Sequence, residues 1–173
     1  GIFSELLEFL CKIINAGFSQ KTIVPTLPLD RYLPICRMYF GMKSIEIHYP
    51  NATKFAGLVS IKEYRPSTNA GILDGFMQMP FELIISQSFI FTDRTAAISS
   101  MQLQQRRLQQ SQDVAVSQIQ EIDEALDSAM SGAFAFGNHH FSVLCIEEDP
   151  KALESSLSMS IVELSNSGIT GVR

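Results

Sequence analysis

The first apolar positions of the chain recur at the spacing of one face of a helix. Over residues 3–15 they fall three or four positions apart, and Gly17 follows where a helix C-cap residue would stand. Ile2 and Phe9 widen the apolar face beyond one stripe. The pattern predicts an amphipathic helix whose extra apolar surface is either part of the core or a place where another segment packs.

Short apolar runs separated by turn residues follow this helix. Three prolines within residues 25–34 predict an extended connector. Residues 36–40 and 44–49 are separated by a short turn and predict a hairpin. Residues 55–64 alternate between apolar and polar in their second half and predict a third strand.

Two further elements lie before the middle of the chain. Residues 71–79 predict a short helix that stops before Pro80. Residues 81–91 are rich in β-branched and aromatic side chains, which predicts a strand in the centre of the sheet.

The next segment carries no proline or glycine from Thr92 to Met130. Thr92 and Asp93 are helix start signals, and apolar residues then follow a seven-residue repeat that is broken at Gln105 and Gln112. The repeat positions include Ile98, Met101, Leu108 and Ile119. The pattern predicts one helix over residues 93–131, about 57 Å long at 1.5 Å per residue. Because so long a helix exceeds the width of a small domain, we expect it to project or to pack on another molecule.

The last third of the chain alternates between strand and helix signals. Residues 139–146 predict a strand, Asp149 and Pro150 mark a helix start, and a new strand begins after Gly168. This order predicts an α+β fold with a mixed or antiparallel sheet and split βαβ, ferredoxin-like elements. We expect residues 1–173 to form a single domain, with the helical arm 93–131 within it, and both ends resemble cuts in a longer protein.

Composition removes several function classes. The chain is 46% hydrophobic and 18% charged, with a net charge of −5. Arg106 and Arg107 form the only adjacent basic pair, so no nucleic-acid partner is expected. The odd number of cysteines and the absence of a CxxC spacing favour a reducing compartment. No segment has the length and apolarity of a transmembrane helix.

No residue pattern predicts a catalytic, cofactor or metal site in this chain. Gly132 and Gly137 have the glycine spacing of a phosphate loop, but Asn138 and His139 stand where lysine and Ser/Thr are required. His139 and His140 are neighbours on a predicted strand and therefore point to opposite faces, so they cannot share one metal ion. Cys36 and Cys145, in apolar runs, are expected to be inert core thiols.

Two alternatives remain open. One is a small enzyme with an unrecognised site, for example His140 near Glu147 or Asp149. The other is an arm that contacts nucleic acid through Arg106 and Arg107.

Several stretches, taken in order, resemble one family. They are residues 28–34 (PLDRYLP), 54–56 (KFA), 61–64 (IKEY), 71–76 (GILDGF), 80–82 (PFE), 87–89 (QSF), 101–107 (MQLQQRR) and 129–132 (AMSG). The sequence resembles the CagE/TrbE/VirB family of type IV secretion ATPases, the component-four ATPases of the VirB series. The resemblance extends along nearly the whole chain.

The resemblance implies a role and not a catalytic site. In that family a region of this kind precedes the ATPase domain, where ATP and Mg are expected, and no position here matches the nucleotide-binding motifs. Family members energise assembly of the secretion channel and pilus, and passage of DNA or effector proteins, at the cytoplasmic face of the bacterial inner membrane. The implied role of this chain is a non-catalytic scaffold or interaction domain.

The resemblance also implies the partners. They are other type IV secretion components at the inner membrane, including small membrane subunits, and further copies of the chain through self-association. The candidate interaction surface comprises Phe3, Leu6, Phe9, Ile98, Met101, Leu108 and Ile119.

Overall fold

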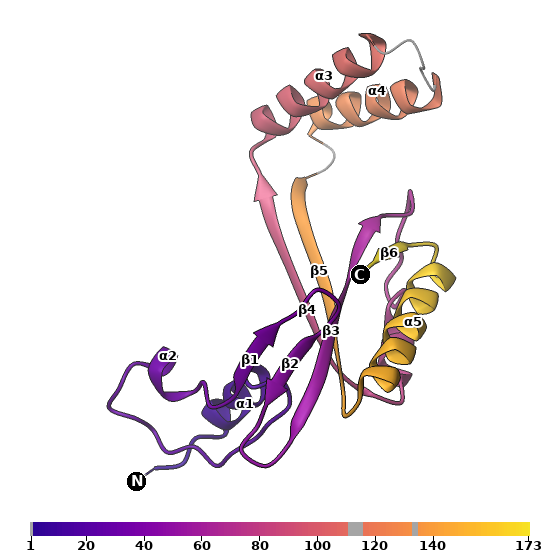
Figure 1. The fold of residues 1–173 in the computed structure, drawn as a ribbon. Helices are drawn as coiled ribbons and strands as arrows, with labels where there is room; N and C mark the ends of the chain where they lie inside the picture. The colour runs from indigo at the N-terminus through magenta and orange to yellow at the C-terminus, as the bar shows by residue number, and fades with distance from the viewer. Residues whose placement is uncertain (1, 111–115, 133–134) are drawn as a thin grey trace. The chain divides into compact units, whose positions relative to one another are not determined.

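The computed structural model describes residues 2–110, 116–132 and 135–173, with positions 110 and 116–119 described by backbone alone. The chain divides into two compact units (Figure 1). The sheet unit comprises residues 1–86 and 141–173, and the hairpin unit comprises residues 87–140.

One six-stranded sheet organises the fold. Its strands are β1 (Arg37–Phe40), β2 (Ile45–His48), β3 (Thr53–Glu63), β4 (Glu82–Thr92), β5 (Phe136–Glu147) and β6 (Thr170–Val172). Their order is β1-β2-β3-β5-β4, and β6 pairs with β3. The pairings β1–β2, β2–β3, β3–β5 and β3–β6 are all antiparallel, which confirms the predicted α+β class and the predicted hairpin.

The position predicted for β4 is wrong. Among the described strands it ends the order and has one neighbour, β5, where a central strand has two. Residues 86–91 are exposed, although they include three large apolar side chains. β-Branched and aromatic residues favour an extended backbone wherever the strand lies, so they do not indicate how many neighbours it has.

The predicted split βαβ unit is confirmed at the C-terminal end. β5 leads into helix α5 (Pro150–Asn166), which leads into β6, and β3 lies between the two strands. Ser60 of β3 pairs with Ser142 of β5 on one edge and with Val172 of β6 on the other. Asp149 caps α5, because its carboxylate accepts hydrogen bonds from the backbone N–H groups of residues 151 and 152 over 2.8 and 3.0 Å.

Alternation along β3 separates two apolar layers. Val59 lies in the larger core with Val143 of β5 and Leu157 of α5. Ala56, on the opposite face of the strand, packs with Ile146 in a smaller cluster that includes Ala16 and Ile47. The sheet therefore has α5 on one face and the end of the first helix on the other.

The remaining helices of the sheet unit are short. They are α1 (Glu5–Ile14), α2 (Leu29–Tyr32) and the 3-10 helix η1 (Asp74–Gln78). The first and third confirm the predicted helices. The connector predicted to be extended contains one helical turn, α2, which begins directly after Pro28 because proline suits the start of a helix.

The single helix predicted over residues 93–131 is wrong. The structure has two helices, α3 (Arg94–Gln110) and α4 (Val116–Ser131), which lie side by side (Figure 1). Arg94 donates a hydrogen bond to the carbonyl oxygen of Met130, and Gln105 donates one to the carboxylate of Asp123, so the helices are antiparallel.

The seven-residue repeat is therefore satisfied within this chain. Ala97 of α3 and Leu126 and Ala129 of α4 are buried. The residues that join the helices, 111–115, lie outside the described part of the chain. Because an apolar stripe specifies only that a helix packs against something, it does not reveal whether the partner comes from the same molecule.

Candidate functional site: an exposed apolar face on the first helix

Helix α1 begins with capping by Ser4. Its hydroxyl oxygen accepts a hydrogen bond from the backbone N–H of Leu7 over 3.4 Å, and Glu5 and Glu8 occupy the first turn, where acidic side chains suit the helix dipole. Leu7 and Cys11, four positions apart, are the buried side of the helix.

A second apolar stripe on α1 faces solvent. Leu6 is 66% exposed and Phe9 is 59% exposed. Ile13 continues the same stripe four positions after Phe9 and is also exposed. Ile2 and Phe3, in the segment just before the helix where Phe3 pairs with Ile23, are exposed as well. Singly exposed apolar side chains are ordinary on protein surfaces, but a contiguous group marks an interaction site. The extra apolar surface predicted for this helix therefore lies outside the core.

Asn15 fixes the orientation of this face. Its carboxamide is 1% exposed and donates to the carbonyl oxygens of Cys11 and Leu33, each over 2.8 Å. Its side-chain oxygen accepts from the backbone N–H groups of Ile35 and Cys36 over 2.7 and 3.0 Å. These bonds join the end of α1 to the connector, so the stripe cannot turn inward without breaking them.

The sequence reasoning missed Asn15. The sequence shows an asparagine directly after an apolar helix. An asparagine at that position indicates the end of a helix but not which distant groups its side chain binds. A second bond at the same place, from the Tyr49 hydroxyl to the carbonyl oxygen of Ala16 over 2.6 Å, also had no local signal.

The predicted interaction residues fall in two places. Phe3, Leu6 and Phe9 are all exposed, Leu6 and Phe9 on α1 and Phe3 in the segment just before it. Ile98, Met101 and Leu108 are half-buried positions of α3 and recur with the buried Ala97 at helical spacing. Ile119 belongs to α4, and its side chain lies outside the described residues. The interaction role of these residues stays a prediction.

Backbone conformation and close packing explain why glycine occupies the two positions that resemble a phosphate loop. Gly132 has a positive φ of 73° at the end of α4, a conformation that favours glycine. A Cβ at Gly137 would lie 2.4 Å from the Phe89 ring and 2.6 Å from the carbonyl oxygen of Ile90. Residues 133–134 of the loop lie outside the described part of the chain.

The thiols named in the sequence have pKa values that oppose reactivity. Burial raises the pKa of the Cys145 thiol and the nearby Glu147 raises it further, against the hydrogen bond between Cys145 and Ser160, which lowers it. Burial also raises the pKa of Cys36, as does the neighbouring Cys11. A raised pKa keeps a thiol protonated, whereas nucleophilic attack requires the thiolate.

The two carboxylates of the alternative enzyme site, Glu147 and Asp149, form hydrogen bonds with groups of α5. Glu147 accepts a hydrogen bond from the Ser156 hydroxyl over 2.5 Å, and Asp149 caps the helix. Among the residues that the structure describes, no three His, Cys, Asp or Glu side chains gather as metal ligands. None of the described helices combines the length and apolarity needed to cross a bilayer.

The comparison with known proteins identifies the family. The model of the CagE, TrbE, VirB family, component of type IV transporter system, matches residues 1–173. The type IV secretion system protein virB4 of Bartonella henselae is 37% identical over 172 residues, covering 96% of this chain and 21% of the relative. The virB4 of Brucella suis is 36% identical over 165 residues, covering 95% and 20%.

A more distant relative has the same coverage. The type IV secretion system protein PtlC of Bordetella pertussis is 31% identical over 163 residues, covering 94% of this chain and 19% of the relative. The chain thus spans about a fifth of the length of these relatives. On the match along its whole length, the chain belongs to the CagE, TrbE, VirB family and is a component of a type IV secretion system.

Proposed function

We propose that residues 1–173 form a non-catalytic docking domain of a type IV secretion ATPase. The observation that carries the proposal is the exposed apolar stripe of α1, held outward by the buried Asn15. Contiguous exposed apolar surface marks an interaction site, and aromatic side chains are frequent centres of binding energy at protein interfaces. Leu6 and Phe9 at the middle of the stripe supply such a centre.

The partner we propose is a small membrane subunit of the same secretion system. Three charged residues, Glu5, Glu8 and Lys12, lie on α1 between the exposed stripe and the buried side of the helix, so the stripe has along one side a polar margin typical of a protein interface. The glutamates outnumber the lysine, which does not favour an anionic lipid surface as the occupant.

The chemistry of transport is assigned to the rest of a longer protein. We propose that ATP and Mg are bound in a later ATPase domain of that protein. The docking domain would hold this ATPase domain at the cytoplasmic face of the inner membrane. Its full-length parent would energise assembly of the channel and pilus and the passage of DNA or effector proteins.

Self-association through a projecting helix was expected because one long helix would expose its apolar stripe. The segment is a pair of helices instead, and the stripe residues of α3 and α4 pack against each other. We therefore place the docking surface on α1 alone. Further copies of the chain are a rival occupant of that stripe, and light scattering distinguishes them from a membrane subunit.

The test compares two variants of the full-length protein. Leu6→Gln with Phe9→Gln removes the centre of the stripe, and Lys12→Gln changes an exposed residue of the same helix outside it. Glutamine is a good helix former, so both variants should keep α1. We expect the double variant to co-purify at least tenfold less with the membrane subunits and to lose secretion, with unchanged ATP hydrolysis.

Burying two large side chains contributes roughly 1.5–3 kcal/mol each, which supports a loss of that size. Equal co-purification by both variants would refute the docking role of α1. Loss of self-association alone, measured by light scattering, would assign the stripe to a second copy of the chain.

A further inference from the structure

The edge of β3 that carries β2 and β6 has a gap. β2 pairs with residues 53–56, and β6 pairs with residues 60–63. On the opposite edge β5 pairs continuously with residues 55–60. Within the part of the chain that the structure describes, residues 57–59 of β3 therefore have a strand neighbour on one edge only.

The backbone of Leu58 points into this gap. Tyr49 donates its backbone N–H to the carbonyl oxygen of Ala52, so Ala52 and every second residue after it on β3 turn their N–H and C=O groups toward β2 and β6. Leu58 belongs to this set, and neither described neighbour on that edge extends to its position. An open ladder position of this kind is a template for another strand.

The end of β6 leads toward the gap. Ser60 pairs with Val172, so antiparallel continuation places the first residue after Arg173 opposite Leu58. A Cβ on Gly171 would lie 2.8 Å from Leu164 of α5, so residue 171 faces that helix. Side chains of a strand alternate between faces, and an extended chain therefore points residue 173 to α5 as well.

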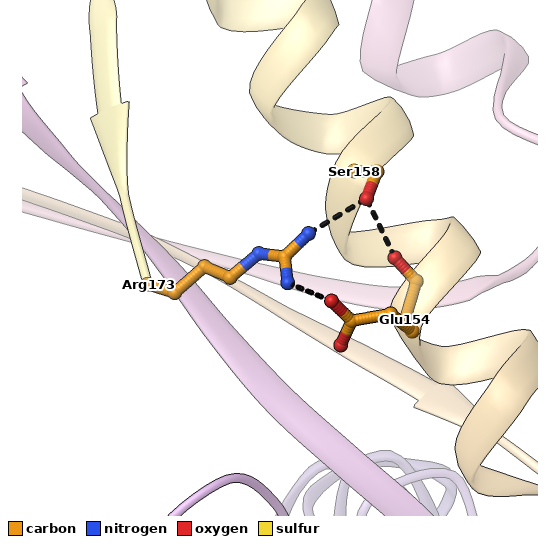
Figure 2. A network of polar contacts seen from close by, with 3 residues as sticks. All are labelled: Glu154, Ser158 and Arg173. Carbon is orange, nitrogen blue, oxygen red and sulfur yellow. Dashed lines mark hydrogen bonds and ion pairs between the residues drawn. The ribbon is translucent and has the colours of Figure 1, made fainter.

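Arg173 has that orientation. Figure 2 shows its guanidinium between two side chains of α5, where it donates to the Ser158 hydroxyl over 2.6 Å and pairs with the carboxylate of Glu154. Ser158 in turn donates to the carbonyl oxygen of Glu154 over 2.8 Å. The extended conformation thus continues to Arg173, one residue beyond the paired part of β6, and the polar network holds it on the correct face of β3.

The gap has space for an extended segment. A cavity of about 510 Å³ lies there, lined by the β1–β2 turn, by Ala56, Gly57 and Leu58 of β3, and by Glu154, Leu157 and Arg173. Residues 41–44 of the turn close its far end, where β2 begins. The space between Arg173 and Ile45 of β2 therefore suits two further residues in the register of β6, opposite Leu58 and Gly57.

We propose that this gap binds the segment that comes after Arg173 in the longer protein, as an extension of β6 along β3. The relatives are about five times as long as this chain, which makes such a segment available. The extension would make the sheet continuous and would join it rigidly to the next domain of the longer protein. This inference concerns a different surface from α1 and does not depend on the docking role proposed for that helix.

Hydrogen exchange of the Leu58 amide tests the proposal. The chain 1–173 is compared with the full-length protein by mass spectrometry on peptides that contain Leu58, with Gly57 as the internal reference because its backbone faces β5. We expect at least tenfold slower exchange at Leu58 in the full-length protein and unchanged exchange at Gly57. Equal exchange at Leu58 in both proteins would overturn the proposal.

A matched pair of proline variants checks the register. Proline at the first residue after Arg173 removes the N–H that would donate to Leu58, whereas proline at the second removes an N–H that points away from β3. Because loss of this bond weakens the pairing that places the carbonyl oxygen of the same residue against the Leu58 N–H, we expect only the first to speed exchange at Leu58. Equal effects of the two prolines would overturn the proposed register. Protection that grows with protein concentration would assign the gap to another molecule and also overturn the proposal.

Discussion

The buried carboxamide of Asn15 donates a hydrogen bond to the carbonyl oxygen of Leu33 over 2.8 Å, joining the end of α1 to a residue 18 positions later. The same side chain accepts from two N–H groups of the connector. One polar side chain therefore supplies hydrogen-bond partners for backbone groups between α2 and β1, where the chain forms neither helix nor strand.

Replacing Asn15 with leucine should lower the free energy of unfolding by about 2–3 kcal/mol, because buried backbone groups would lose their partners. Urea denaturation of the purified chain measures this change. Gln20→Leu, an exposed substitution in the segment between α1 and α2, is the control and should change stability by less than about 0.5 kcal/mol. Similar stabilities for both variants would show that water replaces the Asn15 bonds.

Gly137 on β5 should not tolerate a side chain. Because its Cβ would lie 2.6 Å from the carbonyl oxygen of Ile90, we expect Gly137→Ala to destabilise the protein by about 1–3 kcal/mol. Thermal denaturation followed by circular dichroism provides the measurement. Asn138→Ala, at the exposed next position of the strand, is the matched control and should behave like the wild type.

The raised pKa of Tyr49 predicts that the protein loses stability at alkaline pH. Burial raises the pKa of its phenol to about 12, with smaller contributions from Cys36 and Glu82. Between pH 10 and 12 an unfolded tyrosine loses its proton while the folded one keeps it, so the folded state binds more protons and stability falls as pH rises. The stabilising contribution is complete below pH 10 and is lost as pH rises through 12.

Ultraviolet titration of the phenolates tests this prediction. The wild type should contain a tyrosine that ionises near pH 12, and Tyr49→Phe should lack it. The variant should also lose the bond to the carbonyl oxygen of Ala16 and be less stable at neutral pH. Titration of every tyrosine near pH 10 in the wild type would contradict the prediction.

The helical hairpin can be distinguished from a single helix by one distance. Ala96 and Asp127 are exposed positions near the paired ends of α3 and α4. In a continuous helix they would be about 47 Å apart, whereas packed antiparallel helices have axes about 8–10 Å apart. Spin labels at these positions, with the native cysteines replaced, should therefore report a distance under about 25 Å by pulsed electron resonance.

A labelled pair on one helix controls for the labels themselves. Ala96 and Arg107 lie on α3 in both arrangements and should give the same distance, about 17 Å, whichever is correct. A distance above about 40 Å for the first pair would restore the single helix.

Local signals predicted most of the elements of this protein. Capping by Asp149 and Pro150, the periodicity of α1 and the alternation of β3 each depend on residues within a few positions of one another. Those interactions are the same in any molecule that contains the segment, so the sequence alone was sufficient to predict helices and strands there. It was also sufficient to predict the split βαβ unit and the apolar excess of α1.

The tertiary structure alone decided which partners these elements take. No proline or glycine marks the division between α3 and α4, and the apolar stripe is the same whether it packs within the chain or on another molecule. The outer position of β4, the bonds of Asn15 with residues 33, 35 and 36, and the open place beside Leu58 likewise depend on residues distant in sequence. Such pairings follow from competition among all apolar faces and backbone edges of the folded chain, which no local pattern records.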